Sequence, residues 1–254
     1  MKLTVLGCGG GIGSGRHTTC FLLNDDVLID AGTGITALSL DQLARIDHVF
    51  LTHSHLDHVL GLPLLIDAVG DRRSGPVTVH ALPDTLEILA QHVFNWKLWP
   101  DFREIPDASA PWLRFERMPL GSEVKLAAGS ISSLPAHHTV PACGYRLSSG
   151  GRSLVFTGDT TRSEALMHAL NEMPDLSDLI IETSFENGLR DIAVASMHHW
   201  PDSLALELKH LKNHPRIWIT HLKPGNEVPI LDELRHGIPG REIAPLTQGQ
   251  VIEW

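Results

Sequence analysis

The chain has 254 residues, of which 43% are hydrophobic and 20% are charged, and its formal net charge is −10. That length fits one large globular domain or two small ones, and we expect a single domain over residues 1–254. Affinity for long nucleic acids comes largely from Lys and Arg contacts with phosphate. The acidic net charge therefore predicts that no long nucleic acid is a partner.

Hydropathy and cysteine content indicate the cellular compartment in which we expect the protein. No apolar stretch approaches the roughly 18 residues that a transmembrane helix needs, so we expect no membrane partner. The amino-terminal run Met1–Gly7 is typical of a first strand and lacks the long apolar centre of a signal peptide. The three cysteines are sparse and have no Cys-x-x-Cys spacing, which predicts free thiols in a reducing compartment and a cytoplasmic location.

Short apolar runs between turn residues predict strands in the first part of the chain, and helical spacing predicts the helices. The predicted strands are Leu3–Leu6, Thr19–Leu23, Val27–Asp30, Asp47–Leu51 and Val77–His80. The predicted helices are Thr33–Leu43, Gly61–Val69 and Pro83–Phe94, followed by an aromatic and proline-rich loop over Asn95–Pro111.

The second half of the chain has the same alternation of predicted strands and helices. Strands are predicted at Glu123–Leu126, Ser130–Pro135, Cys143–Ser148, Ser153–Phe156, Leu179–Glu182, Ile217–Thr220 and Val251–Trp254. Helices are predicted at Ser163–Leu170, Asp202–Asn213 and Glu227–His236. Two β-rich halves, each followed by helices, predict two sheets packed between outer helices.

The densest chemical feature is the segment Thr52–His58, which holds four potential metal ligands within six residues. His53 and His55 are two residues apart, so they point the same way in an extended chain. Asp57 and His58 come one turn later and can face back if the chain enters a helix. This spacing suits two adjacent metal ions better than one; the alternative is a solvated His-rich loop.

A predicted strand followed at once by a polar side chain recurs three times. Asp159 and His221 each follow such a strand, and so does one donor from the pair His137 and His138. Open α/β folds gather their sites at the carboxyl ends of strands. Each residue alone is more typical of a turn or cap, but with the first cluster they supply seven nitrogen or oxygen donors and no thiolate.

In order and residue type, these donors resemble those of the metallo-β-lactamase superfamily, over nearly the whole chain. The resemblance implies an α/β (α+β) fold, a four-layer αββα sandwich. It implies that one metal ion is held by His53, His55 and His138, a second by Asp57, His58 and His221, and that Asp159 bridges them. His138 is preferred to His137 because the segment His138–Tyr145 resembles the His-x-x-Pro-x-x-Gly-Tyr context of the relatives. The implied cofactor is two divalent metal ions, zinc by default, with manganese or iron also compatible.

Two further segments have interpretations beside this site. The Gly-rich run Gly7–Gly15 lacks the Gly-Lys-Ser/Thr ending of a phosphate-binding loop and precedes a strand. We expect it to let the first strand turn near the metal site. Asp30, in a turn that resembles the family's Asp-x-Gly, is expected to be structural or to hold a ligand histidine.

Three features resemble bacterial class II 3′,5′-cyclic-nucleotide phosphodiesterases: Leu56 within the first cluster, with the apolar run behind it; the segment Phe94–Phe102; and the segment Ser196–Pro201. Exposed aromatic rings can stack on a base, so we expect Asn95, Trp96 and Trp99 to contact substrate. The alternative is that these aromatic residues only pack their segment down. By the same resemblance His198 acts beside the metals, although His199 and Trp200 depart from the residues expected before Pro201.

Glu182 matches an acidic residue that orients this histidine in the related tRNA 3′-processing endonucleases of the tRNase Z type. A glutamate in a buried strand needs a partner, and His198 is the natural one; a salt bridge to another basic residue is the alternative.

The resemblance to the cyclic-nucleotide phosphodiesterases implies hydrolysis of cyclic AMP or cyclic GMP to the 5′-monophosphate. Asp57 would orient the attacking water, and His198, held by Glu182, would donate a proton to the leaving oxygen.

Three alternatives share these residues. A tRNase Z-type RNA 3′-end endonuclease shares His138, Glu182 and His198, but the chain shows no Gly- and Lys-rich arm. Other hydrolases of the fold act on thioesters, sulfate esters, lactones or phosphonates. A non-catalytic metal-binding protein is disfavoured because all seven donors are present. A homodimer is expected only by resemblance.

Overall fold

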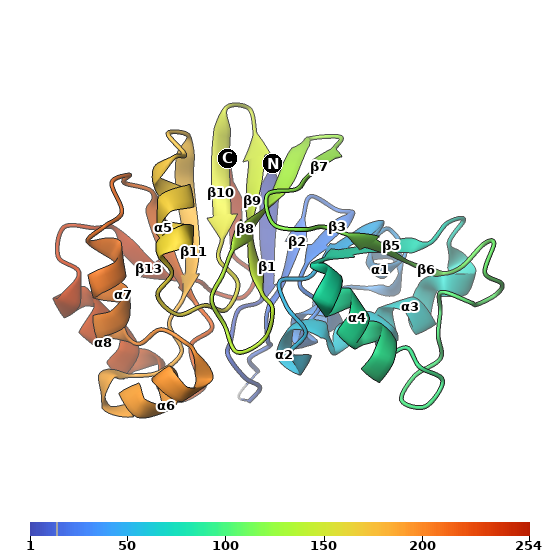
Figure 1. The fold of residues 1–254 in the computed structure, drawn as a ribbon, viewed down its shortest axis with the longest axis horizontal. Coiled ribbons are helices and arrows are strands. Elements are labelled where there is room, and N and C mark those ends of the chain that lie inside the picture. The colour runs from blue at the N-terminus through green and yellow to red at the C-terminus, as the bar shows by residue number, and fades with distance from the viewer. Residues whose placement is uncertain (14) are drawn as a thin grey trace.

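Two seven-stranded sheets pack against each other in the computed structural model of the protein, which describes residues 1–13 and 15–254 (Figure 1). The first sheet has the order β14 (Val251–Glu253), β1 (Lys2–Gly7), β2 (Cys20–Leu23), β3 (Val27–Ile29), β4 (His48–Phe50), β5 (Val77–Ala81) and β6 (Leu113–Arg117). The second has the order β13 (Ile243–Pro245), β12 (Arg216–Thr220), β11 (Leu176–Glu182), β10 (Arg152–Phe156), β9 (Cys143–Ser149), β8 (Gly129–Pro135) and β7 (Glu123–Leu126).

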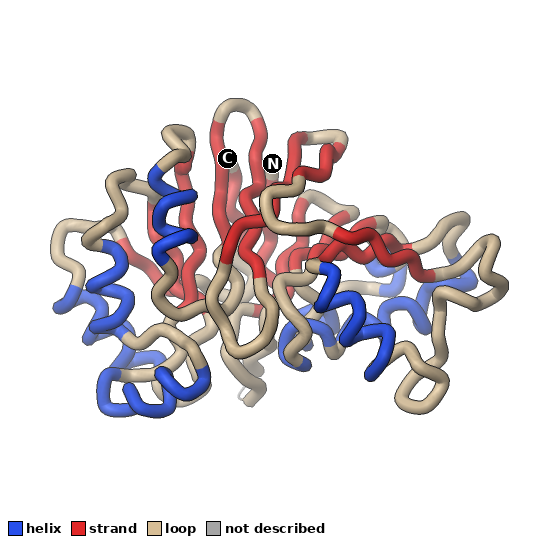
Figure 2. The backbone as a smooth tube through the Cα atoms, in the orientation of Figure 1, coloured by secondary structure: helices blue, strands red, loops and turns tan. Residues whose placement is uncertain are grey.

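Helices cover the outer face of each sheet (Figure 2). On the first sheet these are η1 (Thr33–Ala37), α1 (Leu40–Leu43), α2 (Leu56–Val59), α3 (Gly61–Val69), η2 (Gly70–Arg72) and α4 (Pro83–His92). On the second they are α5 (Glu164–Asn171), η3 (Asn187–Leu189), α6 (Arg190–Ser196), α7 (Pro201–Leu208) and α8 (Glu227–Gly237). The predicted αββα sandwich is confirmed. Among the described residues, no helix is both long enough and apolar enough to cross a bilayer.

Strand β2 shows how alternation of side chains builds the layers. Phe21 and Leu23 pack in the core between the two sheets, whereas Cys20 and Leu22 pack in the core beneath the helices. Successive side chains of a strand point to opposite faces, so a strand covered on both sides is apolar throughout. This explains why the central strands were recognisable as short continuous apolar runs.

The single helix predicted over Thr33–Leu43 is wrong. The chain instead forms the 3₁₀ segment η1 and then the short helix α1, with two extended residues, Leu38 and Ser39, between them. Ser39 begins α1 through a capping box, in which its hydroxyl accepts from the Gln42 amide and the Gln42 side chain accepts from the Ser39 amide. This local arrangement satisfies the first amides of a new helix and breaks the longer one.

Other differences lie at edges and ends. Strands β6 and β13 were not predicted, and each is the last strand of its sheet, where fewer side chains are buried and the apolar pattern is weak. The short helix α6 was also missed. Helix α7 ends at Leu208, well before the predicted Asn213, and the Arg241 guanidinium donates to the carbonyls of Leu208 and Leu211 beyond its last turn.

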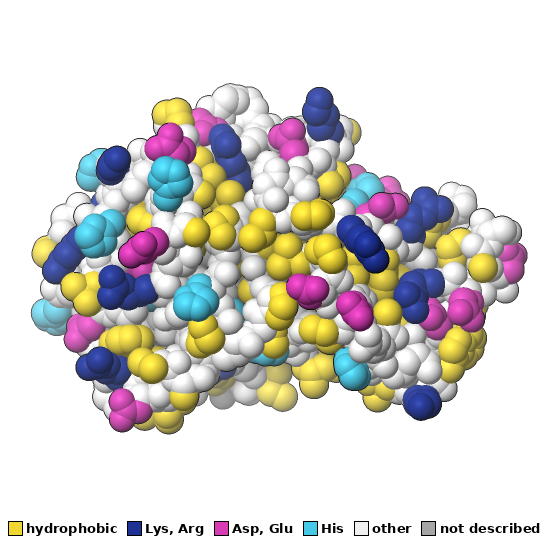
Figure 3. All heavy atoms as spheres, in the orientation of Figure 1, with side chains coloured by type: hydrophobic (Ala, Val, Ile, Leu, Met, Phe, Trp, Pro, Cys, Tyr) yellow, Lys and Arg dark blue, Asp and Glu magenta, His cyan; other side chains and the backbone are white. Residues whose placement is uncertain are grey.

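The two ends of the chain meet at the edge of the first sheet. β14 pairs antiparallel with β1, and the Met1 ammonium donates to the Trp254 carbonyl over 2.8 Å. On the face drawn in Figure 3, acidic and basic side chains are interspersed, and hydrophobic side chains gather toward the middle.

Candidate metal centre

The seven predicted donors come from the ends of strands in both sheets. His53, His55, Asp57 and His58 follow β4, His138 follows β8, Asp159 follows β10 and His221 follows β12. They form two groups that share Asp159, and within each group the donor atoms lie within 4.8 Å of one another.

The first group is His53, His55, His138 and Asp159. His55 Nδ1 lies 3.2 Å from His138 Nε2, and His53 Nε2 lies 3.7 Å from Asp159 Oδ2. Two nitrogens bound to one zinc ion at tetrahedral angles are about 3.3 Å apart, so the first distance fits a shared ion. His137 is exposed, and its Nδ1 lies 3.4 Å from the Arg162 carbonyl oxygen. The structure thus brings His138, and not His137, to this group.

The second group is Asp57, His58, Asp159 and His221. His221 Nε2 is 3.2 Å from both Asp57 Oδ2 and Asp159 Oδ2, and His58 Nε2 is 3.3 Å from Asp159 Oδ2. Because the same Asp159 oxygen faces both groups, one carboxylate could join two ions. This arrangement fits the two-ion expectation.

In the amino-terminal half, Asp30 orients two of the rings. His58 Nδ1 pairs with Asp30 Oδ2 over 2.7 Å, and the Thr52 amide and hydroxyl donate to the same carboxylate. With its proton committed to Asp30, the Thr52 hydroxyl oxygen accepts from His53 Nδ1 over 2.9 Å. Both rings therefore turn Nε2 toward the centre, as metal-ligating histidines held by an outer partner do.

The Nε2 atoms of His53 and His58 show whether a metal ion fits this site. His53 Nε2 and His58 Nε2 are buried and make no hydrogen bond among the described residues, although each faces the Asp159 carboxylate. Burial of an unpaired polar atom costs free energy, and a bound cation would remove that cost. The donor set of imidazoles and carboxylates fits a borderline divalent ion such as zinc.

In the carboxyl-terminal half, Glu182 has the corresponding position. The Ser184 hydroxyl donates to Glu182 Oε2 over 3.1 Å, so its oxygen accepts from His221 Nδ1 over 2.9 Å. His138 Nδ1 donates to the Met197 carbonyl over 3.1 Å. Sequence reasoning missed Ser184; its place two residues after a buried strand glutamate is a signal too common to identify it.

Glu182 also contacts the predicted acid. His198 Nδ1 lies 2.7 Å from Glu182 Oε1, and the His198 ring stacks on His221 at a centroid distance of 5.1 Å and approaches His138 at 4.9 Å. Burial alone would lower the pKa of His198, but the charge and hydrogen bond of Glu182 outweigh it and raise that pKa. The contact with Glu182 thus favours the protonated form of a histidine that lies next to both groups, and it occupies Nδ1 of the ring.

The surroundings shift the pKa values of the candidate ligands in different directions. Burial lowers the pKa of His53, which favours the neutral ring that binds metal. Burial opposes ionisation of Asp57, but its hydrogen bond to His221 and the charges of His58 and His221 outweigh burial and lower its pKa. Burial also lowers the pKa of His58, but Asp159 and Asp30 outweigh it and raise that pKa, so a metal ion and a proton compete there.

Phe185 and Lys223 are additional residues close to His198. The Phe185 ring lies 5.9 Å from the His198 ring, and Lys223 Nζ lies 5.7 Å from the Phe185 centroid. Lys223 Nζ also donates to the Gly10 carbonyl over 2.7 Å, which fastens the Gly-rich run to the site. A Cβ at Gly10 would overlap His221, so the close approach requires glycine there, near the metal centre as expected.

Strained backbone marks the same region. His221, Asp30 and Met197 are non-glycine residues with φ of 61°, 56° and 55°. Left-handed backbone costs free energy and persists where its surroundings demand it, which is common at functional sites. Here it aims a donor, an orienting carboxylate and an orienting carbonyl.

The residues predicted to contact substrate are engaged elsewhere. The Asn95 side chain donates to the Gln91 carbonyl and accepts from the amides of Lys97 and Leu98. The Trp96 amide donates to the Trp99 carbonyl within the same turn. Trp96 is 59% exposed, while Phe102 is buried in the core under the helices. These bonds hold the turn together, so the substrate role of Asn95, Trp96 and Trp99 stays a prediction.

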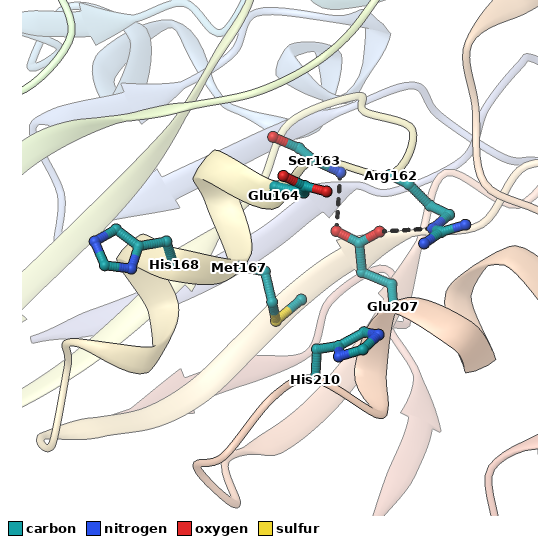
Figure 4. A pocket seen from close by; sticks show the side chains of 7 residues that line it. All are labelled: Arg162, Ser163, Glu164, Met167, His168, Glu207 and His210. Carbon is teal, nitrogen blue, oxygen red and sulfur yellow. Dashed lines mark hydrogen bonds and ion pairs between the residues drawn. The ribbon is translucent and has the colours of Figure 1, made fainter.

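A separate hollow lies between α5 and α7 and contains none of the predicted site residues (Figure 4). Its central group, Glu207, accepts from the Ser163 amide over 3.0 Å and lies 3.7 Å from Arg162 Nε. Burial raises the pKa of Glu207. Its partners show that this carboxylate secures the start of α5.

Comparison with known proteins agrees with this geometry. Residues 25–235 match the family model described as the beta-lactamase superfamily domain. A probable 3′,5′-cyclic-nucleotide phosphodiesterase from Yersinia pestis is 26% identical, over 93% of this chain and 84% of its own length. A ribonuclease Z from Bradyrhizobium diazoefficiens is 33% identical, over 54% of this chain and 46% of its own. The crystal structure of unliganded yeast PDE1 superposes with a TM-score of 0.83, at 19% identity and 98% coverage of both chains, which supports the fold. The chain therefore belongs to the beta-lactamase superfamily, as one of its metal-dependent hydrolases.

Proposed function

We propose that this hydrolase cleaves a 3′,5′-cyclic nucleotide to its 5′-monophosphate. The observation that carries the proposal is the position of His198, whose Nδ1 lies 2.7 Å from Glu182 and whose ring is in contact with a histidine of each donor group. A hydrolase that needs only a nucleophile would not require an acid beside both groups. The relative from Yersinia pestis, similar over 93% of the chain, supports the same substrate class.

In this proposal His53, His55 and His138 would hold the first ion, Asp57, His58 and His221 would hold the second, and Asp159, which belongs to both donor groups, would serve both. We expect zinc, with manganese or iron as alternatives. Divalent ions bound there supply positive charge to the phosphodiester and make water a better nucleophile near neutral pH.

The chain's own groups complete the reaction. The Asp57 carboxylate, whose pKa is lowered, stays ionised and accepts a hydrogen bond that orients the attacking water. His198 donates its proton from Nε2 to the leaving ester oxygen. Glu182 keeps the ring in place and stabilises its positive charge before the transfer.

Cleavage of RNA 3′ ends is the second candidate, because the ribonuclease Z match is higher in identity over its shorter span. The net charge of −10 disfavours it, since a tRNA substrate presents many phosphates. The homodimer and the cytoplasmic location are further predictions of this proposal.

The test is a substrate panel with enzyme loaded with zinc and, separately, with manganese. It contains cyclic AMP, cyclic GMP, bis(p-nitrophenyl) phosphate, a precursor tRNA and a thioester. We expect both cyclic nucleotides to be hydrolysed to 5′-monophosphates, with no cleavage of the tRNA. Cleavage of the thioester without any phosphodiester, or of the tRNA alone, would overturn the proposal.

A further inference from the structure

A groove of about 650 Å³ opens beside the metal centre. Three segments form its walls: the start of α4, the turn after β6 and the connection between β8 and β9. The lining residues are Leu82, Pro83, Asp84, Pro119, Leu120 and residues 136–142. Figure 3 shows hydrophobic side chains gathered on this part of the surface, between the β8–β9 connection and α4.

The groove is continuous with the donor groups. His138 lines it and belongs to the first group, where it is 8% exposed. The neighbouring Thr139 also lines the groove, and its hydroxyl lies 3.5 Å from His55 Nε2. A ligand whose phosphate lies at the donors would therefore extend naturally into this space.

The lining suits an uncharged organic group. Its walls are largely aliphatic or proline side chains, and three prolines (Pro83, Pro119 and Pro141) keep them rigid. Among the described lining residues there is no Lys or Arg, and the one carboxylate is the exposed Asp84. Eight of the twelve lining residues are aliphatic or proline, and the polar ones are Asp84, His137, His138 and Thr139. Small-molecule sites commonly combine apolar walls with a small number of polar groups.

We infer that this groove binds the nucleoside part of a substrate with a single phosphodiester, and that it excludes a continuing nucleic-acid strand. The inference rests on the proposed function and deepens it. The base and ribose contact the aliphatic walls, and Asp84 accepts a hydrogen bond from an amino or hydroxyl group. A strand of RNA would instead bring its next phosphate toward Asp84 with no cation among the lining residues to neutralise it.

This assignment places substrate recognition away from the Trp96 and Trp99 segment. That segment satisfies its polar groups internally, whereas the groove has a donor-group histidine in its wall. The two locations predict different sensitive residues, so one experiment separates them.

The test uses Leu120, which is 52% exposed and lines the groove. Leu120→Asp should raise the KM for cyclic AMP and the inhibition constant of 5′-AMP at least tenfold, and Leu120→Ala should raise them less. Inorganic phosphate, which reaches only the donor groups, should inhibit the variants and the wild type equally. Leu40→Asp, at a 40% exposed position on α1, is the matched control and should leave all these constants unchanged.

A charge reversal tests the exclusion of RNA. Asp84→Lys should strengthen inhibition by a short oligoribonucleotide several-fold and leave inhibition by phosphate unchanged. If wild-type enzyme cleaves cyclic AMP but Leu120→Asp leaves KM within twofold, the groove inference is overturned while the proposed function stands. If cyclic nucleotides are not cleaved, the proposed function fails. The competition between 5′-AMP and phosphate is then measured on bis(p-nitrophenyl) phosphate, and equal inhibition by both would overturn the groove as well.

Discussion

In the amino-terminal half of the chain, four of the seven donors come from six consecutive residues, whereas in the carboxyl-terminal half each donor follows a different strand. The orienting groups differ in the same way. Asp30 holds His58 directly and His53 through Thr52, while Glu182 holds His198 directly and His221 through Ser184. One carboxylate serves proposed metal ligands alone, and the other connects a proposed metal ligand to the proposed acid. Damage to the first half should therefore remove metal, and damage to the second should also change proton transfer.

The largest effect is expected for His53→Ala, which removes a donor from the contiguous cluster. Metal content should fall and phosphodiesterase activity should drop by about 10³-fold or more, as several kcal/mol of charge stabilisation are lost. Elemental analysis and activity assays measure this. His137→Ala is the control for metal content and should keep its metal, because His137 lies outside the donor groups. Full metal content in His53→Ala would contradict the assignment.

His198→Ala should have the next largest effect, a loss of about 10²–10⁴-fold in kcat, the usual contribution of a general acid. Metal content should match that of the wild type, because His198 belongs to neither donor group. A substrate with a good leaving group, such as bis(p-nitrophenyl) phosphate, should lose less activity than cyclic AMP. Equal losses on both substrates would argue against proton donation by this residue.

Asp30→Ala and Ser184→Ala compare the two orienting systems. Loss of an outer partner typically weakens metal affinity about 10–100-fold, and Asp30→Ala should lie at the high end because it frees two ligand rings. Ser184→Ala should lie at the low end, and Ser184→Thr, which retains a hydroxyl, should restore affinity. Chelator competition gives these values. A larger effect at Ser184 would reverse the comparison between the halves.

The smallest change is expected in the pH profile of Glu182→Gln. The Glu182 charge raises the pKa of His198, and activity requires protonated His198, so kcat falls as pH rises through that pKa. Removal of the charge lowers the pKa, and the alkaline limb should therefore move to lower pH. Profiles of kcat against pH test this. A limb that stays in place would show that another group sets it.

Prediction from the sequence succeeded where the pattern of residue types lies within one short segment. The first donor cluster is contiguous, and central strands such as β2 and β11 are buried on both faces, so their residue types alone are informative. It failed at the edge strands β6 and β13, where half-exposed residues weaken the pattern, and over Thr33–Leu43, where the Ser39 capping box divides the helix. Residue type alone could not decide whether Asn95, Trp96 and Trp99 contact substrate, because tryptophan side chains pack within turns as readily as they stack on bases.

The amino-acid sequence by itself determined the donor chemistry: imidazoles and carboxylates without thiolates, in an acidic chain with alternating strands and helices. Only the tertiary structure decided which donors share an ion. It also showed that Asp159 faces both groups, that Ser184 connects Glu182 to His221, and that a groove begins at His138. The physical reason is that β10, β11 and β12 are parallel neighbours, so residues far apart in sequence meet at their carboxyl ends. That meeting depends on strand order and register, which no local pattern of residues specifies.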